Sequence, residues 1–247
     1  MKSVSVAAAA AVSLCAIAAT AYLSLPAVVV VLILASLVTG FGWPHLLDVP
    51  AKKTMGAVIA GAGIASVLTA AMLDGPRMLL WFAPIAAVGT GLIFMVQLLR
   101  GTGQSLRLES TIGGAAGILL ATMAGGWAAA ERLATNASDS SMMLLTGTSL
   151  FFALAAALLP WPDRIVAPLA VVLAALTGTM GALLFTNIAP LAAAIVGAVC
   201  GAVIASFRRL VVAGRGPGSL PGALAIGTAP IAAVGTIVYF LEKLLLV

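Results

Sequence analysis

The chain has 247 residues, of which 63% are hydrophobic and only 8% are charged, and its mean hydropathy is +1.23. Soluble domains carry about 25% charged residues, so this chain has too few to cover a water-exposed surface. The composition also excludes an intrinsically disordered chain and a disulfide-rich secreted scaffold. We therefore expect an all-α fold, a bundle of helices that crosses a bilayer several times.

The charged residues fall in clusters separated by long uncharged stretches, and a helix needs about 20 apolar residues to cross a bilayer. In chain order, the stretches predict nine spans: 4–23, 26–43, 54–73, 78–99, 111–130, 142–160, 165–185, 188–207 and 221–241. Pro26 and Pro190 open two of these spans, because proline cannot continue a preceding helix. None of the nine ranges contains an acidic, basic or histidine residue.

The basic residues predict the orientation. One predicted side carries nine of them: Lys2, Lys52, Lys53, Arg100, Arg107, Arg164, Arg208, Arg209 and Arg215. The other side carries Arg77, Arg132 and Lys243. Short cytoplasmic loops are enriched in Lys and Arg, so we expect the N-terminus inside, the C-terminus outside, and the protein in the plasma (inner) membrane.

The net charge of +5 is explained by these loops. They are expected to contact the anionic headgroups of membrane lipids. No basic run is long enough to follow a nucleic-acid backbone, so nucleic acid is not an expected partner. Lys2 and the apolar run up to Ala21 also have the shape of a cleaved signal peptide, but another apolar span follows at once, and we expect this helix to be retained.

Two motifs recur in the same order. Trp43, Pro44 and Pro50 form a W-P-x5-P pattern after the second span, and Trp161, Pro162 and Pro168 repeat it after the sixth. The sequence predicts that each Trp lies at the membrane interface, that the first Pro ends one helix, and that the second Pro lies in the first turn of the next.

The second motif is rich in glycine. Arg100, Gly101 and Gly103 follow the fourth span, and Arg215, Gly216 and Gly218 follow the eighth. Glycines allow backbone amides to converge on an anion and Arg supplies charge, so these loops are candidate contacts for a phosphate or lipid headgroup. The simpler interpretation is a flexible turn that carries an arginine.

Together the motifs predict a tandem duplication of a four-helix unit. The first repeat would cover 26–130, the second would cover 142–247, and residues 1–25 would form an additional N-terminal helix. Four helices per unit would give both repeats the same orientation in the membrane.

Catalysis and cofactor binding have little support in the sequence. His45 and Asp48 are close in sequence, but no nucleophile accompanies them. There is no metal-ligand arrangement and no phosphate-binding loop, so we expect neither an enzyme nor a cofactor. Within the spans, Gly61-Ala62-Gly63, Gly89-Thr90-Gly91 and Gly125-Gly126 are candidate irregular points that line a path, and Pro84 and Pro230 are candidate kinks.

The stretches from Gly42 to Pro50 and from Val96 to Ser110 resemble an uncharacterised family of actinobacterial integral membrane proteins. The resemblance implies a plasma-membrane location and no known activity.

Two functions remain open at this stage. The first is a permease-like protein that moves a neutral or lipid-like solute without charged groups inside the membrane. The alternative is a non-catalytic accessory or scaffold subunit of a cell-envelope or membrane-enzyme complex, with other membrane-protein subunits as partners. A polar cavity near the middle of the membrane would favour the first, and a solid, dry interface would favour the second.

Overall fold

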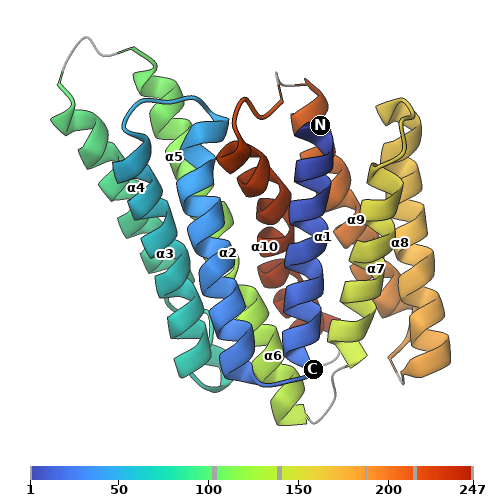
Figure 1. Ribbon diagram of the computed structural model, residues 1–247. Coiled ribbons are helices and arrows are strands. Elements are labelled where there is room, and N and C mark those ends of the chain that lie inside the picture. Colours follow the sequence, from blue (N-terminus) through green and yellow to red (C-terminus); the bar gives the residue numbers. More distant parts are fainter. Residues whose placement is uncertain (1, 102–104, 138–140, 187, 214–215, 246–247) are drawn as a thin grey trace.

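The computed structural model describes residues 2–101, 105–137, 141–186, 188–213 and 216–245, and this part of the chain is helical with no β-strand (Figure 1). The helices are α1 (Lys2–Ala21), α2 (Leu25–Leu46), α3 (Lys52–Met72), α4 (Phe82–Leu99), α5 (Arg107–Thr122), α6 (Gly125–Ala137), α7 (Ser141–Ala157), α8 (Asp163–Phe185), α9 (Pro190–Ala213) and α10 (Leu220–Leu245). A short 3-10 helix, η1 (Gly75–Arg77), precedes α4. The predicted all-α fold is confirmed.

Eight segments of the described chain are long and apolar enough to cross a membrane, and α5 and α6 together form one of them, Arg107–Thr135. Helix α7 is shorter, with an apolar stretch at Met142–Ala157. Successive segments alternate in direction, so the two termini lie at opposite ends of the bundle (Figure 1). The chain is therefore a multi-pass membrane protein, while the end that faces the cytoplasm stays a prediction.

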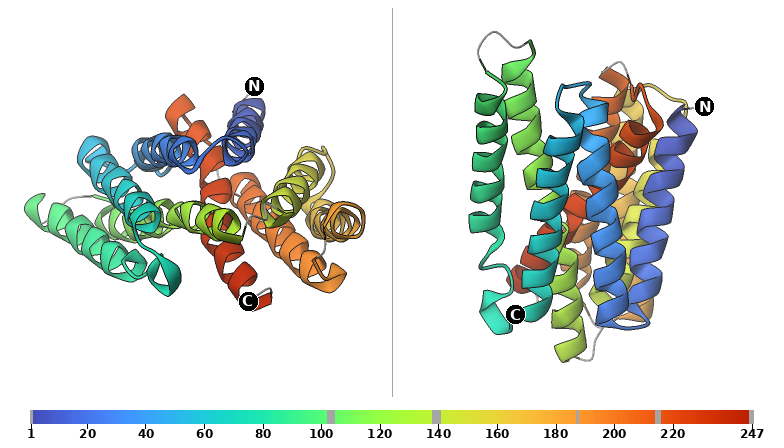
Figure 2. Two further views of the ribbon diagram at one scale, coloured as in Figure 1. Left: turned by 90° about the horizontal axis from the view of Figure 1, so that it is seen from below. Right: turned by 60° about the vertical axis from the view of Figure 1, so that its left-hand side comes forward.

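Helix α10 lies at the centre of the molecule. In Figure 2 it runs obliquely between one group of helices, α2 to α5, and a second group, α7 to α9. It packs mainly against α1, α2 and α6, and almost every residue from Gly222 to Thr236 is buried. A helix that is apolar on all sides belongs in the interior, and α10 joins the two hydrophobic cores of the protein.

Several predicted boundaries are wrong. Helix α2 continues to Leu46, so Pro44 lies inside its last turn and does not end it. Helix α4 begins at Phe82, not at residue 78. Met78 directly follows the η1 turn, and its side chain is buried in the hydrophobic core. Pro84 is consequently in the first turn of α4, where proline is tolerated, whereas Pro230 lies inside α10 as expected.

The two Trp-Pro motifs differ in local structure. Trp43 is buried, and its indole Nε1–H donates a hydrogen bond to the carbonyl oxygen of Gly113 on α5, at 2.8 Å. This tertiary bond and the burial of Pro44 hold the end of α2 in helical form. Trp161 lies in the loop before α8 and is 51% exposed.

The second prolines are also placed differently from the prediction. Pro50 precedes the N-cap of α3, and Pro168 is the sixth residue of α8, so neither lies in a first turn. The α7–α8 loop that carries Trp161 and Pro162 is held instead by Arg208, which bonds the Asp163 carboxylate and the carbonyl oxygens of Leu159 and Trp161.

The packing of the two predicted repeats is not the same. Helix α3 contacts α2, α4, α5 and α6, whereas its counterpart α8 packs mainly against α7 and α9. The division into repeats at 26–130 and 142–247, with 1–25 as an additional helix, therefore stays a prediction.

Close contact between α6 and α10 depends on glycine. A methyl group built on Gly126 would overlap the backbone nitrogen of Thr236, and one on Gly235 would overlap the ring of Trp127. Backbones in a membrane bundle approach this closely only where the side chain is absent or very small.

We expect Gly126→Ala to destabilise the protein by about 1–3 kcal/mol, because neither backbone can move away without disturbing the centre of the bundle. Gly147→Ala on α7 is the matched control, since no atom lies within 4 Å of its added methyl group. Thermal unfolding in detergent measures both variants, and a loss of roughly 2–4 °C per kcal/mol is expected for Gly126→Ala alone. Equal stability of the two variants would contradict the packing described.

Candidate functional site

The fifth span is broken inside the bundle. Helix α5 ends at Thr122 and α6 begins at Gly125, within the apolar segment Arg107–Thr135. At the break, backbone hydrogen bonds span three residues in place of the four of an α-helix. The Ala124 N–H donates to the carbonyl oxygen of Ala121, and the Gly126 N–H donates to that of Met123. The irregular point predicted at Gly125-Gly126 lies directly before these glycines, which are the first two residues of α6.

Hydroxyl groups from two other helices satisfy the carbonyls at the break. Ser66 on α3 donates to the carbonyl oxygen of Thr122, and Thr236 on α10 donates to that of Met123, each at 2.7 Å. A bilayer core offers no water to such groups, so the protein itself must supply their donors. These two bonds therefore connect the end of α5 and the break that follows it to α3 and α10.

Small residues make room for these donors. A methyl group on Gly125 would overlap the hydroxyl oxygen of Ser66, and one on Gly63 would lie 2.9 Å from that of Ser36 and 3.1 Å from the carbonyl oxygen of Ala121. Next to the break, the fully buried Trp127 donates its Nε1–H to the carbonyl oxygen of Ile231 at 2.7 Å. We call Ser66, Thr122, Met123, Gly125 and Thr236 the helix-break site.

Two carboxyl groups are buried next to the ends of predicted spans. Glu131 on α6 is 6% exposed and Glu242 on α10 is 8% exposed. Both residues lie one position beyond the predicted spans 111–130 and 221–241, and those ranges themselves carry no acidic or basic residue. Helix α6 continues to Ala137 and α10 to Leu245, beyond the predicted ends at 130 and 241. In the sequence, the run of small apolar residues that leads up to Glu131 is the pattern that indicates a helix continuing past residue 130.

The two Arg-Gly loops lie at the same end of the bundle but in separate connections, α4–α5 and α9–α10 (Figure 1). Gly101 and Gly216 both have left-handed backbone angles, with φ of +85° and +65°, which glycine adopts without strain. Arg100 donates to the side-chain oxygen of Gln97 at 2.7 Å.

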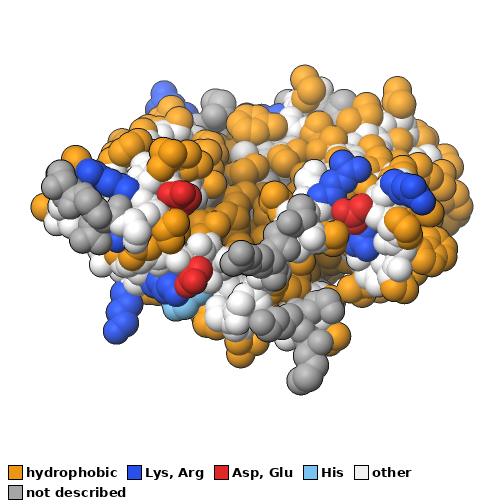
Figure 3. Space-filling view, turned by 90° about the horizontal axis from the view of Figure 1, so that it is seen from above, with side chains coloured by type: hydrophobic (Ala, Val, Ile, Leu, Met, Phe, Trp, Pro, Cys, Tyr) orange, Lys and Arg blue, Asp and Glu red, His pale blue; other side chains and the backbone are white. Residues whose placement is uncertain are grey.

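Gly103 and Arg215 lie outside the described residues. Gly218 is exposed in the connection between α9 and α10. The described residues of the two motifs belong to separate connections, and headgroup binding stays a prediction for each loop. Figure 3 shows charged side chains at this end over both groups of helices, with a hollowed apolar surface between them.

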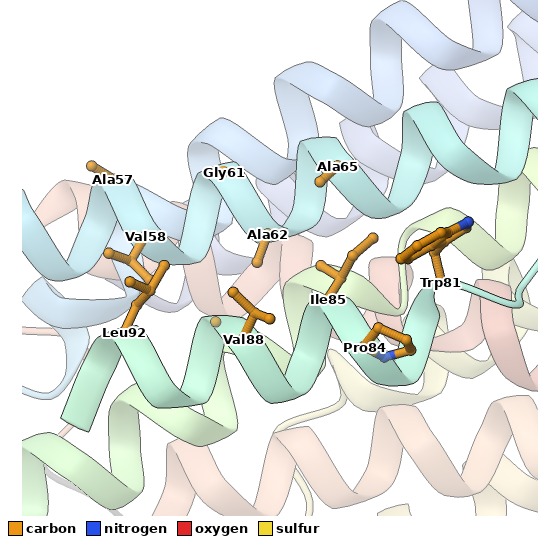
Figure 4. Close-up of a pocket in the computed structure, with 11 residues that line it drawn as sticks. Ala57, Val58, Gly61, Ala62, Ala65, Trp81, Pro84, Ile85, Val88 and Leu92 are labelled. Carbon is orange, nitrogen blue, oxygen red and sulfur yellow. The ribbon is translucent and has the colours of Figure 1, made fainter. Parts of the chain in front are cut away.

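Two apolar grooves flank α4. The first, of about 430 Å³, lies between α3 and α4 and is lined by residues that include Gly61, Ala62, Trp81, Val88 and Gly89 (Figure 4). The second, of about 530 Å³, lies between α4 and α5 and includes Thr90 and Gly91. Two of the three glycine clusters predicted to line a path thus contribute to grooves, which are open on the outer side of the bundle, and a path stays a prediction.

His45 and Asp48 do not pair. The Nδ1 atom of His45 lies 2.8 Å from the carbonyl oxygen of Phe41, while Asp48 accepts a hydrogen bond from Lys52 at 2.7 Å. That bond and the charge of Lys52 lower the pKa of Asp48 below its ordinary value. Among the described residues, no group of three His, Cys, Asp or Glu side chains is placed to hold a metal ion.

No family model, curated protein or solved structure matches this chain. The resemblance to an actinobacterial membrane family stays an expectation, and the function has to be inferred from the residues themselves.

We expect Thr236→Val to destabilise the protein by about 1 kcal/mol, because it leaves the Met123 carbonyl without its donor from α10. Thr179→Val is the matched control, since the Thr179 hydroxyl bonds only Ala175 on its own helix. Chemical or thermal unfolding in the same detergent compares the two. If both substitutions cost the same, the hydroxyl does not support the break.

Proposed function

We propose that this multi-pass membrane protein is permease-like and moves a neutral or lipid-like solute. The observation that carries the proposal is the break in the α5–α6 span. Interrupted helices are a recurring feature of transporters, where non-helical backbone at membrane depth lies inside the protein and provides both polar groups and a point of movement. Here the break also receives hydrogen bonds from the hydroxyl groups of Ser66 and Thr236 on two other helices.

The nature of the solute is suggested by the grooves on either side of α4. Their lining is apolar, and much of it is exposed, including Trp81, Val88 and Leu92. A groove that opens on the membrane-facing side favours a solute that enters from the bilayer, which points to an amphiphile or a lipid.

The second candidate is the accessory or scaffold subunit. The tight glycine contacts of α10 with α2 and α6 favour it, because the centre of the bundle is solid where a water-filled path would be expected. On this alternative, the broken span is a packing feature and the exposed apolar surfaces bind other membrane proteins.

A transport assay separates the candidates. The purified protein is reconstituted in phosphatidylcholine vesicles that carry a fluorescent phospholipid, and the rate at which the label becomes accessible from outside is measured. We expect wild-type protein to accelerate this movement. Thr236→Val should change the rate about fivefold, because the loss of one hydrogen bond worth roughly 1 kcal/mol destabilises one conformation of the α5–α6 break relative to another.

Thr179→Val is again the control and should behave as wild type. No acceleration by wild-type protein, for the fluorescent phospholipid or for a panel of neutral amphiphiles, would remove the permease proposal. Repeated co-purification with one membrane-protein partner would then support the scaffold.

A further inference from the structure

Glu131 is the most unusual polar residue of the described chain. It lies on α6 inside the span Arg107–Thr135, is 6% exposed, and its Oε2 atom has no hydrogen-bond partner among the described residues. Its Oε1 atom accepts only a long bond of 3.5 Å from the hydroxyl of Thr135. A carboxylate removed from water is costly unless it is paired with a cation or protonated.

The neighbouring basic groups are engaged elsewhere. Arg132 bonds the carboxylate of Asp74 and the carbonyl oxygen of Ala71, both at the end of α3. The ammonium group of Lys243 lies 5.6 Å from the ring centre of Tyr239. No ion pair to Glu131 is formed within the described part of the chain. Protonation removes the charge without any partner from the described residues.

Glu131 lies near one end of the bundle although its side chain is buried. Thr135 lies one turn further along α6 and is exposed, and Asp74 beside Arg132 is exposed as well. The carboxyl group thus lies about one helical turn inside the end of the bundle, where a proton can arrive from that end. The titratable or charged groups on or directly following the elements packed against this part of α6 are Asp74, Tyr239, Glu242 and Lys243.

We propose that Glu131 is a proton-binding site of this protein. Its carboxylate takes a proton from water to give a neutral carboxyl group, which is held in the bundle. The proton returns to water when the carboxyl group becomes accessible again. Because Glu131 is on α6, six residues beyond Gly125, movement at the helix-break site changes its access to water. This coupling to movement rests on the proposed permease function, whereas the proton site itself does not.

The test is a chemical probe that needs no known solute. A hydrophobic carbodiimide reacts with protonated carboxyl groups in apolar surroundings, and mass spectrometry locates the adduct. Full-length protein in phosphatidylcholine vesicles is treated at about pH 6 and about pH 9, with Glu131→Gln and Glu109→Gln as variants. Glu109 is the matched control because it is exposed near the start of α5.

We expect an adduct at Glu131 whose yield falls about tenfold or more at the higher pH, since each pH unit above the midpoint lowers the protonated fraction about tenfold. The adduct should disappear in Glu131→Gln and persist in Glu109→Gln. No adduct at Glu131, or a yield that does not change with pH, would overturn the proposal. Protection by sodium but not by potassium at fixed pH would overturn it in favour of a sodium site.

The outcome is separate from the transport assay. A pH-dependent adduct in a protein that moves no solute keeps the proton site and removes the permease. Lipid movement without the adduct keeps the permease and removes the proton site.

Discussion

The structure depends on one constraint: a backbone carbonyl within a membrane bundle must find its hydrogen-bond donor in the protein. The break between α5 and α6 weakens the local bonding of Thr122 and Met123, and Ser66 and Thr236 compensate. Their bonds fix three helices at one point. The glycines that line this point are consequences of the same constraint, because the donors reach the carbonyls only if the backbones lie in close contact.

This junction explains the arrangement of the other helices. Helix α10, which supplies a donor to the break, lies at the centre, where it touches α1, α2 and α6 and contributes to both hydrophobic cores (Figure 2). Helix α4 takes no part in the junction. It lies at the edge with many exposed apolar side chains, and grooves remain on both of its sides. Helix packing is therefore close around the α5–α6 break, where polar groups must be hydrogen-bonded, and looser around α4, where lipid can fill the grooves.

The sequence was a good guide to helices and a poor guide to contacts. Charge-free runs located the apolar segments of the described chain, although not the division of one of them into α5 and α6 or the η1 turn, because the cost of burying charge is local to each residue. The Trp-Pro motifs were misinterpreted since their structures depend on distant partners. Trp43 is held by Gly113, and the loop of Trp161 is held by Arg208. Likewise, glycines at 125 and 126 indicated an irregular point, but nothing near them identified Ser66 or Thr236 as donors.

The charge pattern bears on the choice between carrier and scaffold. A chain that excludes charge from almost all its membrane-crossing residues nevertheless keeps Glu131 in its interior, although a glutamine or leucine there would be less costly. A static scaffold gains nothing from this cost, because no bonded partner for Oε2 is found in the described chain. Under the permease proposal α6 moves, and a carboxyl group that binds and releases a proton would then stabilise two positions of this helix in turn. The buried carboxyl and the broken span therefore favour the same interpretation, a bundle with one moving segment.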